Sequence, residues 1–78
     1  MYKGVIEVKP LEDFKLDLKF ENGERRVFDL SRYLNKGKFA ELKNMQMFNS
    51  ARVAFDSVEW ANGIDIDPET LYNESKCF

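Results

Sequence analysis

Carboxylates gather around one bend of the chain and are the first residues that could support chemistry. They flank Asn62-Gly63: Glu59, Asp65, Asp67 and Glu69. Crowded oxygen ligands can bind a hard cation such as calcium, and a carboxylate pair with separated pKa values can act as acid and base. The run lacks the ligand spacing of a calcium loop, and Asp67 suits a helix cap before Pro68. We expect this acidic bend, residues 59–69, to be structural, with ligand- or metal-dependent activity as the alternative.

The sequence has few side chains that could act as nucleophiles, and none with an imidazole group. The 78 residues include no His and one Cys, so there is no imidazole base or ligand, no internal disulfide and no thiolate zinc site. Cys77 has no His to activate it and no cation evident nearby, which predicts a free thiol. We therefore expect a protein that is not an enzyme and that needs no metal or cofactor.

Basic residues form a second candidate site on the first predicted hairpin. The cations expected on its outer face are Lys15, Lys19, Arg25, Arg26 and Arg32. A basic stripe can contact phosphates, but most aromatic side chains that would stack bases point to the opposite face. Asp17 and Glu24 lie among the cations, so cross-strand ion pairs are the simpler interpretation. Nucleic-acid binding is an alternative that we do not favour.

Composition predicts one small globular domain over residues 1–78. Hydrophobic residues make up 44% and aromatic residues 14%, although a chain of this size buries only about 60% of its unfolded surface. The net charge is −2, divided into +2 over residues 1–40 and −4 over residues 41–78. No apolar run approaches the roughly 18 residues of a membrane span, and the start lacks a secretory signal. A lone Cys suits a reducing compartment, so we expect a cytoplasmic protein without membrane contact.

The first half predicts three strands. Residues 5–8 form a short apolar run that Pro10 should end. Residues 14–20 alternate apolar and charged side chains, which puts four large apolar groups on one face of a strand. Asn22-Gly23 predicts a type I′ hairpin turn before the return strand. A two-residue loop would leave Phe28 on the charged face and a longer loop or bulge would bury it; the sequence leaves both open.

Short helical segments follow. Ser31 is a candidate N-cap for one turn, and Gly37 can adopt the left-handed conformation that ends it. Residues 38–44 predict a second short helix with two apolar residues on one face. The run Met45-Gln46-Met47-Phe48 could form an adaptable partner-binding patch, but core filling is the favoured interpretation in a small domain.

The second half predicts another hairpin and a helix. A turn centred on Asp56-Ser57 would put four apolar residues on one buried face: Val53, Phe55, Val58 and Trp60. Asn62-Gly63 makes the next bend, and Asp67-Pro68 is a strong helix start, with Asp67 as N-cap and Pro68 in the first turn. The sum predicts an α+β fold: a small antiparallel sheet of about five strands built from two hairpins plus an N-terminal strand, with short helices in the middle and at the C-terminus.

Several of these motifs together resemble a known family. The first half carries Phe20-x-Asn22-Gly23-Glu24, Phe28-Asp29-Leu30 and Tyr33-Leu34-x-x-Gly37-x-Phe39-x-x-Leu42. The second half carries Trp60-x-Asn62-Gly63-Ile64-Asp65-Ile66-Asp67-Pro68-Glu69-x-Leu71-Tyr72. From Val5 to Tyr72 the chain resembles the small bacterial domain of unknown function numbered 2442. Its signature residues are Trp60, Asn62, Gly63, Asp65, Asp67, Pro68, Leu71 and Tyr72.

The resemblance implies more about fold than about activity. Members contain a small α+β domain, which in some is followed by a helix-turn-helix DNA-binding domain that this sequence lacks. They are often encoded beside another small protein, an arrangement similar to a toxin–antitoxin pair. The family offers no catalytic residues, and the signature describes a strand end, a bend and a capped helix, so we expect the signature residues to be structural.

These observations favour a non-enzymatic protein-interaction module, the antitoxin-like member of a two-gene pair. The expected partners are a small protein encoded nearby and a second copy of the chain, which would pair through an exposed strand edge. The acidic bend as a ligand or metal site and the basic hairpin as a nucleic-acid surface are the alternatives.

Overall fold

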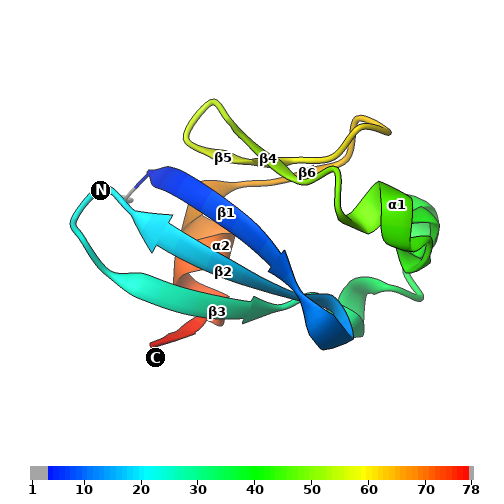
Figure 1. Cartoon of the computed structure of the whole chain (residues 1–78), viewed down its shortest axis with the longest axis horizontal. Coiled ribbons are helices and arrows are strands. Elements are labelled where there is room, and N and C mark those ends of the chain that lie inside the picture. Colours follow the sequence, from blue (N-terminus) through cyan, green and yellow to red (C-terminus); the bar gives the residue numbers. More distant parts are fainter. Residues whose placement is uncertain (1–3, 78) are drawn as a thin grey trace.

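The computed structural model describes residues 4–77 and has an α+β fold (Figure 1). One antiparallel sheet has the order β1-β2-β3-β7: β1 (Val5–Leu11), β2 (Lys15–Phe20), β3 (Arg25–Asp29) and β7 (Lys76–Cys77). A second has the order β4-β5-β6: β4 (Arg52–Ala54), β5 (Ser57–Glu59) and β6 (Asp65–Ile66). The helices are η1 (Glu12–Phe14), η2 (Ser31–Tyr33), η3 (Gly37–Lys43), α1 (Met45–Phe48) and α2 (Pro68–Glu74), the η elements being 3-10 helices. The predicted class is confirmed, with the two hairpins in separate sheets.

The core lies between the two sheets and the helices. In Figure 1 helix α2 covers the back of the larger sheet, the β4–β5 hairpin lies beside β1, and α1 projects at one end. No helix of the described residues, 4–77, lies over the opposite face of the larger sheet. The largest fully buried side chains are Trp60, Phe20, Phe28, Phe48, Leu16, Leu18, Leu30, Leu42, Leu71, Val5 and Val58.

The first hairpin resolves the open question about Phe28. Its loop is longer than two residues: the Phe20 amide donates to the Glu24 carbonyl at 2.9 Å, and the Gly23 amide donates to the Phe20 carbonyl at 2.9 Å. Phe28 therefore lies opposite Leu16 and is buried. The type I′ prediction is wrong, because among these loop residues only Gly23 has a positive φ, of 91°; the loop matches a turn followed by a left-handed glycine bulge.

The first strand is longer than predicted. Pro10 does not end β1, which continues to Leu11 and pairs Pro10 with Leu16. This is possible because β1 is an edge strand, where a missing amide donor leaves no neighbour unpaired. The pairing shifts between Val5 and Glu7, so Ile6 lies in a bulge.

The helical middle follows the prediction except at its cap. Ser31 does not act as N-cap; its amide and hydroxyl both donate to Asp29 Oδ1, at 2.9 and 2.6 Å. Gly37 has the predicted left-handed conformation, with a φ of 51°, but it begins η3 instead of ending η2, whose last residue is Tyr33. The expected second helix is η3, and its Leu42 is buried as predicted.

The second hairpin has a different register from the predicted one. Val53 pairs with Val58, and the turn residues are Phe55 and Asp56, with φ values of 51° and 64°. The buried Ser57 hydroxyl donates to the Ile66 carbonyl, which holds Ser57 in β5 and moves the turn back by one residue. Phe55 is consequently 95% exposed, so its predicted place on the buried face is wrong.

The turn after β5 repeats the geometry of the first hairpin loop. Gly63 donates to the Trp60 carbonyl at 2.9 Å, and the Trp60 amide donates to the Ile64 carbonyl at 2.8 Å. Asn62 Oδ1 accepts from the Ile64 amide at 3.1 Å, as Asn22 Oδ1 accepts from Glu24. The aromatic-x-Asn-Gly sequence thus forms the same turn at both places, with Gly63 at a φ of 89°.

The C-terminal helix begins as predicted. Asp67 Oδ2 accepts from the Thr70 amide at 3.0 Å, and Pro68 stands in the first turn of α2. Leu71 is buried. The short strand β7 that follows was not expected; it pairs with β3 at Arg26 and Val27.

Replacement of Trp60 tests the centre of this fold. Its indole is fully buried, and Nε1 donates to the Phe48 carbonyl at 3.1 Å. We expect Trp60→Phe to lower the free energy of unfolding by about 2–4 kcal/mol, because it leaves a cavity and removes one of the two hydrogen bonds to the Phe48 carbonyl. Urea denaturation measures this. Met45→Ala, at a half-exposed residue, is the control and should change it by less than about 0.5 kcal/mol; equal losses would contradict the assignment.

Candidate protein-interaction site

The turn at residues 60–64, which contains the signature residues Trp60, Asn62 and Gly63, joins the helical segment to the smaller sheet. Besides the Trp60 bond to Phe48, Asn62 Nδ2 donates to Glu41 Oε1 at 3.1 Å, and Lys38 Nζ donates to the Asn62 carbonyl at 3.0 Å. Glu41 and Lys38 both belong to η3. Trp60, Asn62 and Gly63 therefore have structural roles that bring η3 and α1 beside the turn.

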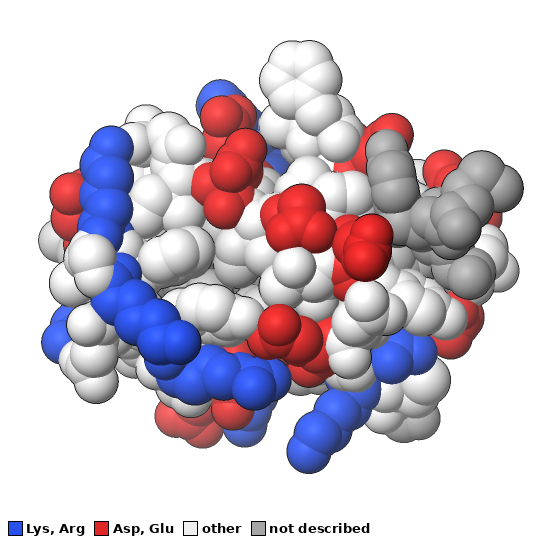
Figure 2. Space-filling view, turned by 180° about the vertical axis from the view of Figure 1, so that it is seen from behind, with Lys and Arg blue, Asp and Glu red and all other residues white. Residues whose placement is uncertain are grey.

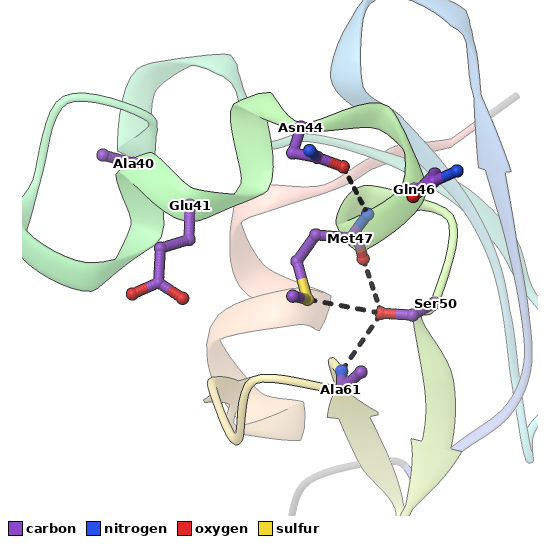
Figure 3. Close-up of a pocket in the computed structure, with 7 residues that line it drawn as sticks. All are labelled: Ala40, Glu41, Asn44, Gln46, Met47, Ser50 and Ala61. Carbon is purple, nitrogen blue, oxygen red and sulfur yellow. Dashed lines mark hydrogen bonds between the residues drawn. The ribbon is translucent and has the colours of Figure 1, made fainter.

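An open groove of about 570 Å³ lies where these segments meet (Figure 3). Its lining residues are Ala40, Glu41, Asn44, Gln46, Met47, Ser50 and Ala61. Ser50 Oγ donates to the Met47 carbonyl and accepts from the Ala61 amide at 3.0 Å, and Asn44 Oδ1 accepts from the Met47 amide at 3.1 Å. These polar atoms already bind one another, so the free lining of the groove is mainly Met47, Ala40 and the Gln46 amide.

The methionine run divides between core and surface. Phe48 is buried and Met47 half-buried, which supports the core interpretation for them. Met45 is 50% exposed, and the core interpretation is wrong for it. This run therefore leaves apolar surface beside the groove.

The acidic bend does not form a cation site in the described residues. Glu59 accepts from Arg52 at 3.0 Å, and Asp67 caps α2. Asp65 is exposed in β6, opposite Glu59. Across residues 4–77, no group of three or more Cys, Asp or Glu side chains is placed to hold a metal ion.

Part of the predicted basic stripe forms ion pairs within the fold. Arg25 donates to Asp17 at 2.8 Å, and Lys19 lies 3.9 Å from Glu7, as the ion-pair interpretation predicts. Lys15 shares this sheet face, opposite Asp29. Figure 2, seen from behind, shows a separate band of basic side chains at the end that carries η3 and α1, with acidic side chains over the centre.

Arg26 does not belong to the outer stripe, contrary to the prediction. It lies opposite Leu18, on the core side of the sheet, and its guanidinium stacks over the Tyr72 ring at 4.5 Å. Nε donates to Ser75 Oγ at 2.8 Å, and Nη1 donates to Cys77 Sγ at 3.1 Å. A cation therefore does contact Cys77, which the sequence did not reveal, and Arg26 fixes the chain after α2.

The same network explains Tyr72. Its hydroxyl donates to the Glu24 carboxylate. This bond, together with a second from Asn22, lowers the pKa of Glu24. The same bond to Glu24 raises the pKa of Tyr72. The phenol thus connects α2 to the first hairpin loop, which gives this signature residue a structural role.

Apolar side chains are exposed at one end of the second hairpin. Phe55 is 95% exposed, Ile6 49% and Val53 37%. The turn contacts the beginning of β1, because the Val5 amide donates to the Asp56 carbonyl at 2.9 Å, and β4 packs beside β1. We call Ile6, Val53 and Phe55 the apolar tip; the sequence pattern assigned two of the three to the core.

Edge pairing with a second copy stays a prediction. The longest edge strand is β1, and it carries Pro10, a bulge at Ile6 and an amide at Val5 already bonded to Asp56. Such features discourage edge-to-edge association.

A family model described as a protein of unknown function, DUF2442, matches residues 5–76. The chain belongs to the DUF2442 family. This confirms the resemblance over nearly the whole chain. No match to a curated protein or a solved structure is significant.

The DUF2442 match runs from the first residue of β1 to the first residue of β7. The signature residues other than Asp65 form the turn, the cap and the inner side of α2, whereas Asp65 is exposed in β6. Within the described residues, no helix is long and apolar enough to cross a membrane.

The cap at Asp67 predicts a pH-dependent stability. Bonds from the Thr70 hydroxyl and amide lower the pKa of Asp67 below its ordinary value of 3.8. The ionised cap therefore stabilises the fold fully above about pH 4 and loses this effect as pH falls through the folded-state pKa. We expect Asp67→Ala to lose about 1 kcal/mol at pH 7, and the difference from the natural chain to shrink below pH 3.8.

Denaturation with urea from pH 7 to pH 2.5 measures this difference. The control is Asp65→Ala, at an exposed acid in the same segment, which should change the free energy of unfolding by less than about 0.5 kcal/mol at pH 7. A difference for Asp67→Ala that grows toward low pH would contradict the assigned cap.

Proposed function

We propose that this DUF2442 chain is a non-enzymatic protein-interaction domain of the cytoplasm and the antitoxin-like member of a two-gene pair. The observation that carries the proposal is Phe55, a large aromatic side chain that is 95% exposed at a φ of 51°. The partner is a small protein encoded nearby, and the apolar tip is the surface that binds it.

Phe at position 55 contributes little to the stability of the free domain. A left-handed backbone conformation costs an L-residue other than Gly, Asn or Asp about 1–2 kcal/mol, and an exposed ring recovers none of this by burial. Asn-Asp or Asn-Gly would form the same turn without that cost. Burial of a Phe ring is worth about 1.5–3 kcal/mol, so a partner that encloses Phe55 would offset the strain.

The surroundings of Phe55 support an anchoring role. Val53 stands two residues earlier on β4, and Ile6 lies in the bulge of the neighbouring strand. Aromatic side chains dominate binding energy when a partner pocket encloses them among smaller apolar contacts. The turn is held in place by the bond from Val5 to Asp56 and by Gly4, at which a Cβ would meet the Asp56 side chain at 3.0 Å. A turn whose backbone is already held in place needs little ordering on binding.

Phe55→Asn separates binding from folding. We expect the variant to be as stable as the natural chain or up to about 1 kcal/mol more stable, because Asn tolerates the left-handed conformation. We expect its affinity for the neighbouring gene product to fall by about 30-fold or more, as for loss of an aromatic hot spot. Co-expression and calorimetry of the purified complex measure affinity, and urea denaturation measures stability.

The matched control is Met45→Ala, at an exposed apolar residue beside the groove and outside the apolar tip. It should leave the affinity within about twofold, since peripheral contacts contribute little. Separate, non-interacting behaviour of the two natural proteins would overturn the proposed pair. If the complex with Phe55→Asn is intact, the partner binds a surface other than the apolar tip.

A further inference from the structure

A hollow on the larger sheet is distinct from both the apolar tip and the groove. It encloses about 500 Å³, a volume suited to a small molecule. Its lining residues are Lys15, Val27, Asp29, Arg32, Glu74 and Lys76. Three of them are cations, and they come from β2, η2 and β7.

The strand register explains why these side chains meet. Lys15 lies directly opposite Asp29 on β2 and β3, and Val27 lies directly opposite Lys76 on β3 and β7. Val27 and Asp29 are two residues apart on one strand, so all four share the sheet face that lacks a helix. Because β7 pairs with β3 only at Arg26 and Val27, the edge of β3 beyond them is left open as one wall of the hollow.

Both carboxylates of the hollow are already bonded. Asp29 Oδ1 accepts two hydrogen bonds from Ser31, which, with the nearby charges of Lys15 and Arg32, lower the pKa of Asp29 and keep it ionised. Glu74 Oε1 accepts from the Tyr33 hydroxyl and lies 3.7 Å from Arg32 Nη2. Hydrogen bonds from Ser31 and Tyr33 thus fix the positions of the two carboxylates, which keep their negative charges.

The two lysines of the hollow, unlike Arg32, form no ion pair with the carboxylates of the described residues. Among residues 4–77, every ion pair within 4.0 Å involves a cation other than Lys15 and Lys76. Lys15 is nevertheless half-buried, with the half-buried Val27 side chain on the same face. Three cations and two carboxylates leave the hollow with one net positive charge.

We propose that this hollow binds a small organic anion, whose carboxylate or phosphate group is held by Lys15, Lys76 and Arg32 and whose apolar part lies on Val27. Lysine ammonium groups bind such oxyanions as point charges, and arginine supplies directed donors. One bound anionic group balances the net charge of the lining. The site is independent of the proposed partner complex, since the apolar tip contributes none of its residues.

The test is a titration of the whole ¹⁵N-labelled chain with sodium benzoate and, separately, with inorganic phosphate, at constant ionic strength maintained with chloride. We expect saturable amide shifts at Val27, Asp29 and Lys76 with at least one probe. We expect Lys15→Gln/Lys76→Gln to weaken that binding by about tenfold or more, because charge-assisted bonds to the anion are lost. Binding of benzoate would indicate a carboxylate ligand, and binding of inorganic phosphate would indicate a phosphate ligand.

The matched control is Lys9→Gln/Lys43→Gln, which removes two cations outside the hollow and should leave the affinity within about twofold. Unchanged spectra away from the substituted residues show that each variant folds. Shifts that do not saturate, that chloride reproduces, or that both double variants reduce equally would overturn the proposal.

Discussion

The buried indole of Trp60 is the contact on which the rest of the molecule depends. Its ring fills the core, its Nε1 donates to Phe48 at the end of α1, and its backbone closes the turn at Gly63. The helical segment has few regular hydrogen bonds of its own, being mostly 3-10 turns, so tertiary contacts must hold it. One side chain thereby joins β5, the following turn and α1.

Phe55 shows the opposite use of an aromatic residue. It occupies a backbone conformation that suits Gly, Asn or Asp and exposes its ring to water. Departures from local preference without a compensating contact in the fold are expected where function is selected. Trp60, five residues later in the chain, stabilises the fold from inside the core. Phe55, in contrast, is held at the surface, where a partner could contact it.

Local patterns predicted most elements, and the failures have identifiable causes. The alternation in β2 and the Asp67-Pro68 cap depend on neighbouring residues, so the sequence predicted both, except that Phe14 lies in η1 with a φ of 58° and not in the strand. The register of the second hairpin depends on the Ser57 bond to Ile66, nine residues away, and no local pattern reveals it. Pro10 was misjudged because an edge position follows from sheet order, and Arg26 because its face follows from the length of the preceding loop.

Site residues were harder to predict than elements. That the signature residues are structural stays a prediction, with which the turn at Asn62-Gly63 and the cap at Asp67 agree. The apolar tip was missed because two of its residues fit an alternating strand, and the hollow was missed because its cations come from segments up to 61 residues apart. A sequence pattern gives the face of a strand but not which distant segment lies over it.

The repeated aromatic-x-Asn-Gly turn has a consequence for the order of folding. Both copies close through contacts only three or four residues apart, and such short loops and hairpins form within microseconds. Arg26 and Ser75, in contrast, are 49 residues apart, and contacts of that span carry a larger entropy of closure. The two turns can therefore set the hairpins early and independently, while the C-terminal strand joins last and is the segment most readily released from the native state.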